Sequence, residues 1–215
     1  MRELARSFAT PAEIFEADVR DIAAVKSAAN DFMSRHGVPD LVIGNAGISK
    51  GTLTEFERDA EAFRETFETN VMGLVHTFHP FVAPMRSSGQ GILAGIASVA
   101  GFRGLPGASA YSASKAAAIS YLEALRVELH GSGVRVVTIC PGFIDTPMTA
   151  RNPYPMPFIL PVDDAARRIV RAIDSGRSFS VIPWQMAIVG RLLGLLPNAI
   201  YDRLLAGRAH KPRDN

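Results

Sequence analysis

The chain has 215 residues, a formal net charge of +2 and 47% hydrophobic residues. This length fits one domain with a sizeable core, and the composition is ordinary for a globular protein without blocks of like charge. We therefore predict a single domain over residues 1–215 with one functional site, and we do not expect nucleic acid as a partner.

A single cysteine, Cys140, excludes an internal disulfide and a multi-cysteine metal site, and it predicts a reducing compartment. The five histidines share no metal-ligand spacing, so no metal is expected. No apolar N-terminal run resembles a signal peptide, and charged residues and a proline interrupt the most apolar stretch, residues 184–205. We expect a cytoplasmic protein.

The end of the chain carries two further predictions. The apolar face of residues 184–205 is predicted to form a substrate lid or an oligomer contact, and a helix on a membrane surface is the alternative. The last residues, RAHKPRDN (208–215), are predicted to be a frayed polar end.

Short apolar runs alternate with longer segments of helical periodicity. Strands are predicted at 14–19, 41–47, 91–98, 134–142 and 179–183. Helices are predicted at 21–35, 59–85, 109–130, 163–175 and 185–206. Such alternation predicts an α/β fold with a Rossmann-like, doubly wound parallel sheet in three αβα layers, whose ligands bind at the carboxyl ends of the strands.

Tyr111 and Lys115 are four residues apart on a predicted helix, so their side chains leave from one face, about 6 Å apart at Cβ. A nearby ammonium favours the phenolate, and we expect it to lower the phenol pKa by about 1–3 units from its usual ~10. Ser98 ends the preceding strand and can bring a hydroxyl to the same edge. The three residues predict carbonyl chemistry by a general acid–base, although an isolated Tyr-x-x-x-Lys pair also occurs by chance.

Six motifs extend this pattern over nearly the whole chain: DVRD (18–21), DLVIGNAG (40–47), NVMG (70–73), IASVAG (96–101), YSASK (111–115) and CPGFIDTPM (140–148). In their order and spacing they resemble the short-chain dehydrogenase/reductase family. The resemblance implies an NAD(P)-dependent oxidoreductase that transfers a hydride between NAD or NADP and a small-molecule alcohol or carbonyl substrate.

The resemblance also implies a catalytic tetrad. Tyr111 would be the acid/base, Ser98 would polarise the substrate oxygen, Lys115 would hold the nicotinamide ribose and lower the phenol pKa, and Asn70 would anchor a water in a proton relay. The implied cofactor-binding residues are Asp18, Val19, Asn45, Ala46, Gly47, Tyr111, Lys115, Pro141, Gly142, Ile144 and Thr146.

Several of these positions also have simpler explanations. Asparagine is unfavourable inside a helix, so Asn70 could serve only a kink or a buried amide hydrogen bond. Asp40 is expected to steady the sheet, and Cys140 to be a core residue. Three glycines could serve only as turn residues: Gly47, Gly101 and Gly142.

The chain departs from the family pattern before Asp18, where no strand, glycine-rich turn and helix are found. The cluster GQGILAG (89–95) runs into a strand rather than out of one, so we reject it as the phosphate-binding turn. The missing first and second strands would lie between segments 14–19 and 41–47, so a gap in the sheet is expected.

Two explanations of this departure remain open. Either Met1 is an internal methionine of a longer protein, or the fold has adapted, and the chain as written is expected to bind NAD(P) poorly. The alternative function is a non-catalytic binding or oligomerisation domain that kept the scaffold.

The substrate and the oligomer give the last predictions. Residues 146–161 are the expected substrate loop, and Tyr154, Met156, Phe158 and Ile159 could line a pocket for a lipophilic substrate or could pack on their own core. Segments 59–85 and 109–130 resemble the helices through which family members form four-helix interfaces, so a homodimer or homotetramer is expected. The apolar residues behind this prediction are Phe63, Phe67, Phe78, Phe81, Ile119, Leu122 and Leu125.

Overall fold

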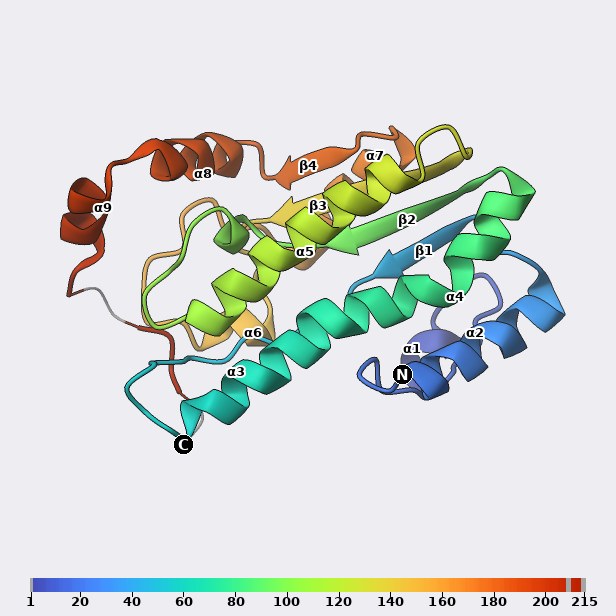
Figure 1. Cartoon of the computed structure of the whole chain (residues 1–215), viewed down its shortest axis with the longest axis horizontal. Coiled ribbons are helices and arrows are strands. Elements are labelled where there is room, and N and C mark those ends of the chain that lie inside the picture. The colour runs from blue at the N-terminus through green and yellow to red at the C-terminus, as the bar shows by residue number, and fades with distance from the viewer. Residues whose placement is uncertain (1, 208–209, 214–215) are drawn as a thin grey trace.

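The computed structural model of the chain describes residues 2–207 and 210–213. At its centre lies a parallel sheet in the order β1-β2-β3-β4 (Figure 1). The strands are β1 (Leu41–Gly44), β2 (Gly91–Ile96), β3 (Val134–Pro141) and β4 (Phe179–Ile182). These are four of the five predicted strands, and their carboxyl ends lie at one edge of the sheet because all pairs are parallel.

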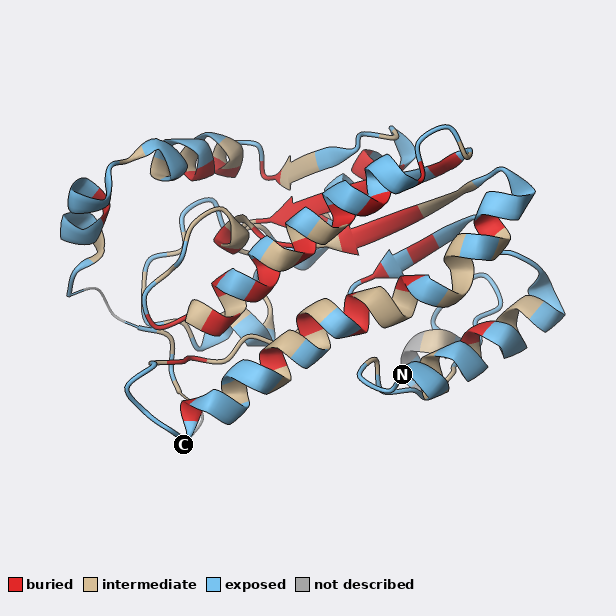
Figure 2. Ribbon diagram, in the orientation of Figure 1, coloured by how far each residue is buried: buried red, intermediate tan, exposed pale blue. Residues whose placement is uncertain are grey.

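Helices cover both faces of the sheet, which confirms the predicted three-layer αβα fold. On one face α4 (Gly73–Ser88) and α5 (Ser109–Glu128) enclose a core that includes Phe78, Leu93 and Leu122. On the other face α7 (Val162–Asp174) covers β2, β3 and β4, with Ile139 and Ile173 in the second core. Figure 2 shows that burial is concentrated in the middle strands and on the helix faces turned toward them.

The remaining elements follow the predicted periodicity with two breaks. They are α1 (Arg2–Arg6), α2 (Ile22–His36), α3 (Asp59–Phe67), the π-helix η1 (Glu68–Met72), the 3₁₀ helix η2 (Val99–Gly101), α6 (Pro147–Ala150), α8 (Gln185–Leu195) and α9 (Asn198–Leu205). The predicted helix 59–85 becomes α3, η1 and α4 in direct succession. The predicted helix 185–206 is divided before Pro197, which cannot continue the hydrogen bonding of α8. In the described part of the chain, no helix combines the length and low polarity needed to cross a bilayer.

The predicted strand at 14–19 is wrong. This segment has no ladder partner among the described residues and packs on the helix that follows it. The Phe15 ring lies 6.4 Å from the Phe32 ring of α2, and Glu13 forms an ion pair of 2.7 Å with Arg35. Because no strand lies beside it, the segment is fixed by side-chain contacts rather than by a backbone ladder.

One face of β1 is open to solvent. Leu41 and Ile43 are 38% and 44% exposed, whereas the alternate residue Val42 is buried in the core under α4. The side-chain alternation of the strand therefore holds, but only one of its two faces is covered in this structure.

The residues named for an oligomer interface divide between core and surface. Phe78, Leu122 and Leu125 are buried in the core of this one chain, so the prediction is wrong for these three residues. Phe81 packs against the same core but is only partly buried, so for Phe81 it stays a prediction. Phe63 remains 39% exposed on α3.

The prediction of a frayed C-terminal end is wrong for residues 210–213, while residues 208–209 and 214–215 lie outside the described residues. Lys211 Nζ donates to Ser49 Oγ at 2.7 Å, and Arg213 forms two hydrogen bonds with the Asp59 carboxylate at 2.8 and 2.9 Å. This segment is therefore docked on the loop that leads from β1 to α3.

We expect neighbouring strands to respond differently to truncation of their side chains. Leu93→Ala should lower the free energy of unfolding by about 2–5 kcal/mol, because Leu93 is fully enclosed between β2 and the helices. Ile43→Ala should lower it by less than about 1 kcal/mol, because this side chain faces water. Urea unfolding of the two variants measures both values, and equal losses would show that the outer face of β1 is covered.

Candidate active site

Asn70 is fixed at the centre of the site by a local change in helix geometry. It lies in the π-helix η1 and is 2% exposed. Its side-chain oxygen accepts the Ile48 N–H at 2.8 Å, and its amide nitrogen donates to the Ile48 carbonyl and to Ser114 Oγ, both at 2.9 Å. The wider helical turn and the buried amide bonds explain why an asparagine stands inside this helix.

Ser98 lies where β2 ends and η2 begins. Its hydroxyl accepts the Ala100 N–H at 3.1 Å and approaches the Pro141 carbonyl at 3.4 Å, so it links the ends of β2 and β3. The Ser98 side chain also lowers the pKa of the nearby Tyr111 phenol, against the larger rise that burial causes. The expected meeting of Ser98 and Tyr111 at the carboxyl edge is thus present in the structure.

Tyr111 and Lys115 project from the first turns of α5 toward this edge. Lys115 is 5% exposed, and its ammonium lies 5.8 Å from the centre of the Tyr111 ring and donates to the Ile96 carbonyl at 2.8 Å. Burial lowers the pKa of Lys115 from 10.5 to about 8. The ammonium is therefore held at the end of β2 in a position where it has lost much of its hydration.

The predicted lowering of the phenol pKa by Lys115 is wrong for this structure. Burial raises the pKa of Tyr111 above its usual value, and the nearby Ser98 side chain opposes the rise. The ammonium is directed at the Ile96 carbonyl rather than at the phenol oxygen, and it is itself poorly hydrated. The Tyr111 phenol is therefore neutral at neutral pH.

Three glycines around the site permit close packing, and none of them has a positive φ. A Cβ on Gly47 would lie 3.2 Å from Asn70 Oδ1, and a Cβ on Gly101 would lie 2.7 Å from the Lys115 carbonyl carbon. A Cβ on Gly142 would lie 2.8 Å from a side-chain carbon of Met186. A role as turn residues was the alternative for these glycines. In the structure it is the close approach of neighbouring atoms that disfavours a side chain at these positions.

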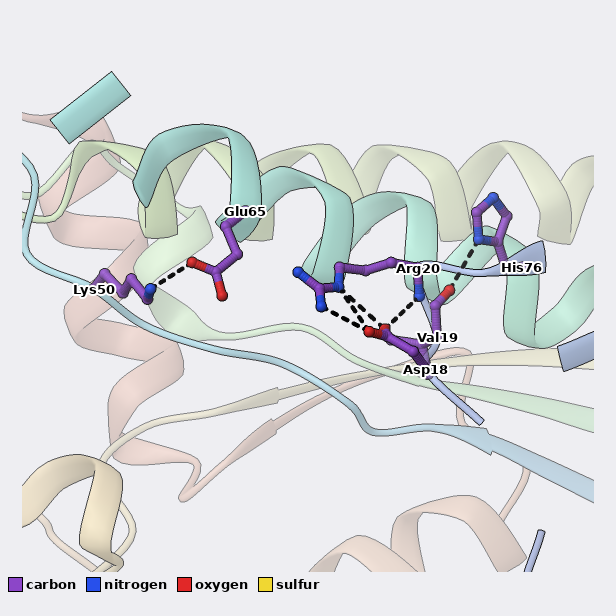
Figure 3. Close-up of polar contacts among 6 residues, drawn as sticks. All are labelled: Asp18, Val19, Arg20, Lys50, Glu65 and His76. Carbon is purple, nitrogen blue, oxygen red and sulfur yellow. Dashed lines mark hydrogen bonds and ion pairs between the residues drawn. The ribbon is translucent and has the colours of Figure 1, made fainter. Parts of the chain in front are cut away.

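The two predicted adenine-side residues, Asp18 and Val19, lie in the segment that packs beside α4. Asp18 accepts from the backbone and guanidinium of Arg20 at 2.7 to 3.1 Å, and Arg20 holds the pKa of Asp18 down at about 2 (Figure 3). The Val19 carbonyl meets His76 Nδ1 at 2.9 Å, and its side chain packs on Gly73. Figure 3 shows these groups along the same helical face as the Lys50–Glu65 ion pair.

The remaining predicted cofactor residues lie at the ends of β1 and β3. Asn45 and Ala46 are exposed after the last residue of β1. The Gly142 N–H donates to the Ile182 carbonyl at 2.7 Å, which ties the end of β3 to β4. Ile144 pairs with Leu160, and Thr146 begins α6 with a capping box to Thr149. The structure thus brings the predicted residues to one edge of the sheet.

Three contributors were not singled out from the sequence. Ser114 receives the Asn70 amide and donates to the Tyr111 carbonyl at 2.8 Å, and its place between Tyr111 and Lys115 was the available signal. Arg20 holds the Asp18 carboxylate, and His76 holds the Val19 carbonyl. The contact of His76 could not be predicted from local spacing, because His76 lies 57 residues from Val19.

The expected substrate loop is only partly enclosed. Tyr154 lies 6.4 Å from the Phe143 ring, and Met156 is half-buried. Phe158 and Ile159 are 50% and 40% exposed, so they do not line an interior pocket here. Cys140 is fully buried and burial raises its thiol pKa to about 12, which agrees with its predicted role in the core. Within residues 2–207 and 210–213, no cluster of His, Cys, Asp and Glu could hold a metal ion.

Comparisons with known proteins agree with this geometry. A family model described as short chain dehydrogenase matches residues 1–155. An uncharacterized oxidoreductase of Myxococcus xanthus is 38% identical over 202 residues, which cover 94% of this chain and 79% of that protein. The 2-dehydro-3-deoxy-L-rhamnonate dehydrogenase (NAD(+)) of a Sphingomonas species is 38% identical over 136 residues, which are 63% of this chain and 55% of that relative.

A solved structure extends the agreement to three dimensions. A short chain dehydrogenase from Burkholderia cenocepacia, determined in complex with NADP, superposes with a TM-score of 0.79 at 29% identity, over 93% of this chain and 81% of that one. The parallel sheet, its two helical layers and the Tyr–Lys pair at its carboxyl edge define a Rossmann-like oxidoreductase. The chain belongs to the short-chain dehydrogenase/reductase family, whose cofactor is NAD or NADP.

The buried ammonium gives a prediction for stability against pH. The folded chain releases the Lys115 proton near pH 8, while the unfolded chain keeps it to about 10.5. Between these values the unfolded state binds more protons, so this residue makes the free energy of unfolding rise with pH.

The test is urea unfolding of the wild type and Lys115→Met at pH 7.5 and pH 10. The free energy of unfolding of the wild type, minus that of Lys115→Met, should be larger at pH 10 than at pH 7.5. Contributions of the other titrating groups are shared by both proteins and cancel in this difference. A difference that stays constant across the window would show that the ammonium is hydrated.

Proposed function

We propose that this site transfers a hydride between NAD(P) and an alcohol or carbonyl substrate, with Tyr111 as the acid/base. The observation that supports it most is the position of Tyr111, whose phenol lies near Ser98 and whose ring lies 5.8 Å from the buried Lys115 ammonium at the carboxyl edge of the sheet. In parallel α/β sheets this edge is where ligands bind.

The protonation state of the phenol favours one direction of the reaction. Because burial raises the pKa of Tyr111, the phenol carries a proton at neutral pH and can donate it to the oxygen of a carbonyl as that carbonyl is reduced. Ser98 would hold the same oxygen with its hydroxyl. In the reverse reaction the phenolate would accept the alcohol proton. The dinucleotide, when bound, supplies or receives the hydride.

The residues at the edge would hold the two ends of the dinucleotide. The bare backbone at Gly47 leaves room in front of the Lys115 ammonium, where a ribose can be hydrogen-bonded. Asn45 and Ala46 would line the cleft beside it, and Asp18 with Val19 would border the adenine. Facing the nicotinamide would be Pro141, Gly142, Ile144 and Thr146. Asn70 would support the site through Ile48 and, as the family resemblance implies, through a water.

Assembly and location complete the proposal. We propose a homodimer or homotetramer through α3 and α5, where Phe63 and Val127 remain 39% and 62% exposed. Light scattering should give a mass at least twice 23.1 kDa at micromolar concentration, and a monomer would contradict the assembly.

The buried, unbridged Cys140 is compatible with a cytoplasmic location.

The decisive substitution removes the phenol oxygen and keeps the ring. Tyr111→Phe should reduce turnover of an alcohol or carbonyl substrate by about 10²–10⁴-fold or more, with the fold retained, because the proton donor is lost. Tyr121→Phe is the matched control, since it removes a half-buried phenol from the same helix on the side of the core. Steady-state kinetics of both variants measure the effect. Unchanged turnover in Tyr111→Phe would contradict the role of Tyr111 as the acid/base, and a wild-type chain without turnover would favour the non-catalytic alternative.

A further inference from the structure

Residues 210–213, which we call the C-terminal strap, bring a second cation to Tyr111. The Lys211 ammonium lies 5.9 Å from the centre of the Tyr111 ring, nearly the same distance as the Lys115 ammonium at 5.8 Å. Lys211 also donates to Ser49 Oγ at 2.7 Å. Its side chain therefore occupies a defined place beside the phenol rather than extending into solvent.

The strap is held by contacts on both sides of Lys211. The Arg213 guanidinium pairs with Asp59 through two hydrogen bonds and lies 3.7 Å over the centre of the Phe56 ring. Both members of this pair are largely buried, with side-chain exposures of 17% and 9%, and Arg213 keeps the pKa of Asp59 below its usual value. A charge-assisted, two-pronged pair of this kind fixes a chain segment more firmly than an exposed one.

The surface under the strap is shaped to receive it. The Gly51 N–H donates to the Pro212 carbonyl at 3.2 Å. A Cβ on Gly51 would lie 2.5 Å from the carbonyl oxygens of Lys211 and Pro212, and a Cβ on Gly107 would lie 2.5 Å from the His210 side chain. Any other residue at position 51 would push the strap away.

A cavity of 330 Å³ lies between the strap and the expected substrate loop. Two cationic side chains line it, Lys211 from the strap and Arg151 from the end of α6, together with Ser49 and the apolar Met148. Ammonium and guanidinium groups with a hydroxyl between two segments are suited to a carboxylate or a phosphate.

We propose that this cavity binds an anionic group of the substrate, so that Lys211 and Arg151 select oxo acids over neutral carbonyl compounds. The proposal rests on the proposed function, since it places the reacting carbonyl at Tyr111. The anionic group of the substrate should lie within a few bonds of the reacting carbonyl, because the Lys211 ammonium is close to the Tyr111 ring. It also changes the expected substrate, from a lipophilic compound to one with an acidic end.

Matched ligands test the proposal by binding alone. The probes are pyruvate, acetoacetate and levulinate, each against its methyl ester, titrated by calorimetry into the wild-type chain. In at least one pair we expect the acid to bind about tenfold tighter than the ester. Lys211→Met and Gly51→Ala should reduce that preference to less than about threefold, the first by removing the charge and the second by displacing the strap. Lys26→Met removes an exposed lysine from α2 and should leave the preference intact.

A cofactor phosphate is the other source of an anion near this edge. Nicotinamide mononucleotide against nicotinamide riboside provides that arm of the experiment. Three results overturn the proposal: no acid preference in the wild type, a preference unchanged by Lys211→Met, or a charge preference confined to the mononucleotide. The proposed function fails by a different result, since it falls if Tyr111→Phe retains turnover, whatever the binding of the acids.

Discussion

The site depends on how a lysine ammonium is buried. Lys115 donates to the Ile96 carbonyl at the end of β2, so the first turns of α5 are held against the sheet edge and Tyr111 is turned toward Ser98. This requires η2 to pass directly over the α5 backbone, which only a glycine at position 101 allows. The cost of removing the ammonium from water appears as a pKa of about 8 for Lys115.

A second set of contacts holds the opposite wall of the site. Asn70 turns the loop after β1 through both backbone groups of Ile48 and reaches Ser114, one residue before Lys115. The π-helix gives its amide the room to do so, because an extra residue in the turn changes the direction of the side chain. The same helix continues into α4, where Gly73 and His76 receive Val19. One continuous helix therefore connects Asn70 to the Asp18–Val19 segment.

The sequence predicted the parts of this arrangement that depend on local periodicity and spacing. The strands of the sheet, the long helices and the meeting of Ser98, Tyr111 and Lys115 follow from apolar runs and from an i, i+4 pair. It could not predict the direction of the phenol pKa, because that depends on burial and on the Ile96 carbonyl that takes the ammonium. The segment 14–19 was predicted as a strand because its composition is typical of one, but a strand is stable only beside a neighbouring strand. The docking of the C-terminal strap depends on Arg213 and Asp59, 154 residues apart, and no local pattern joins them.

The protonation states of Tyr111 and the buried Lys115 can be measured directly by NMR titration of the chain with ¹³C-labelled tyrosine and lysine, assigned with Tyr111→Phe and Lys115→Met. We expect the Lys115 signal to titrate near pH 8, and the Tyr111 signal to remain that of a neutral phenol beyond its usual pKa of 10.0. If Lys115 titrated at 10.5 and Tyr111 at 10.0, both groups would be hydrated, and the account of an ammonium buried at the end of β2 would be contradicted.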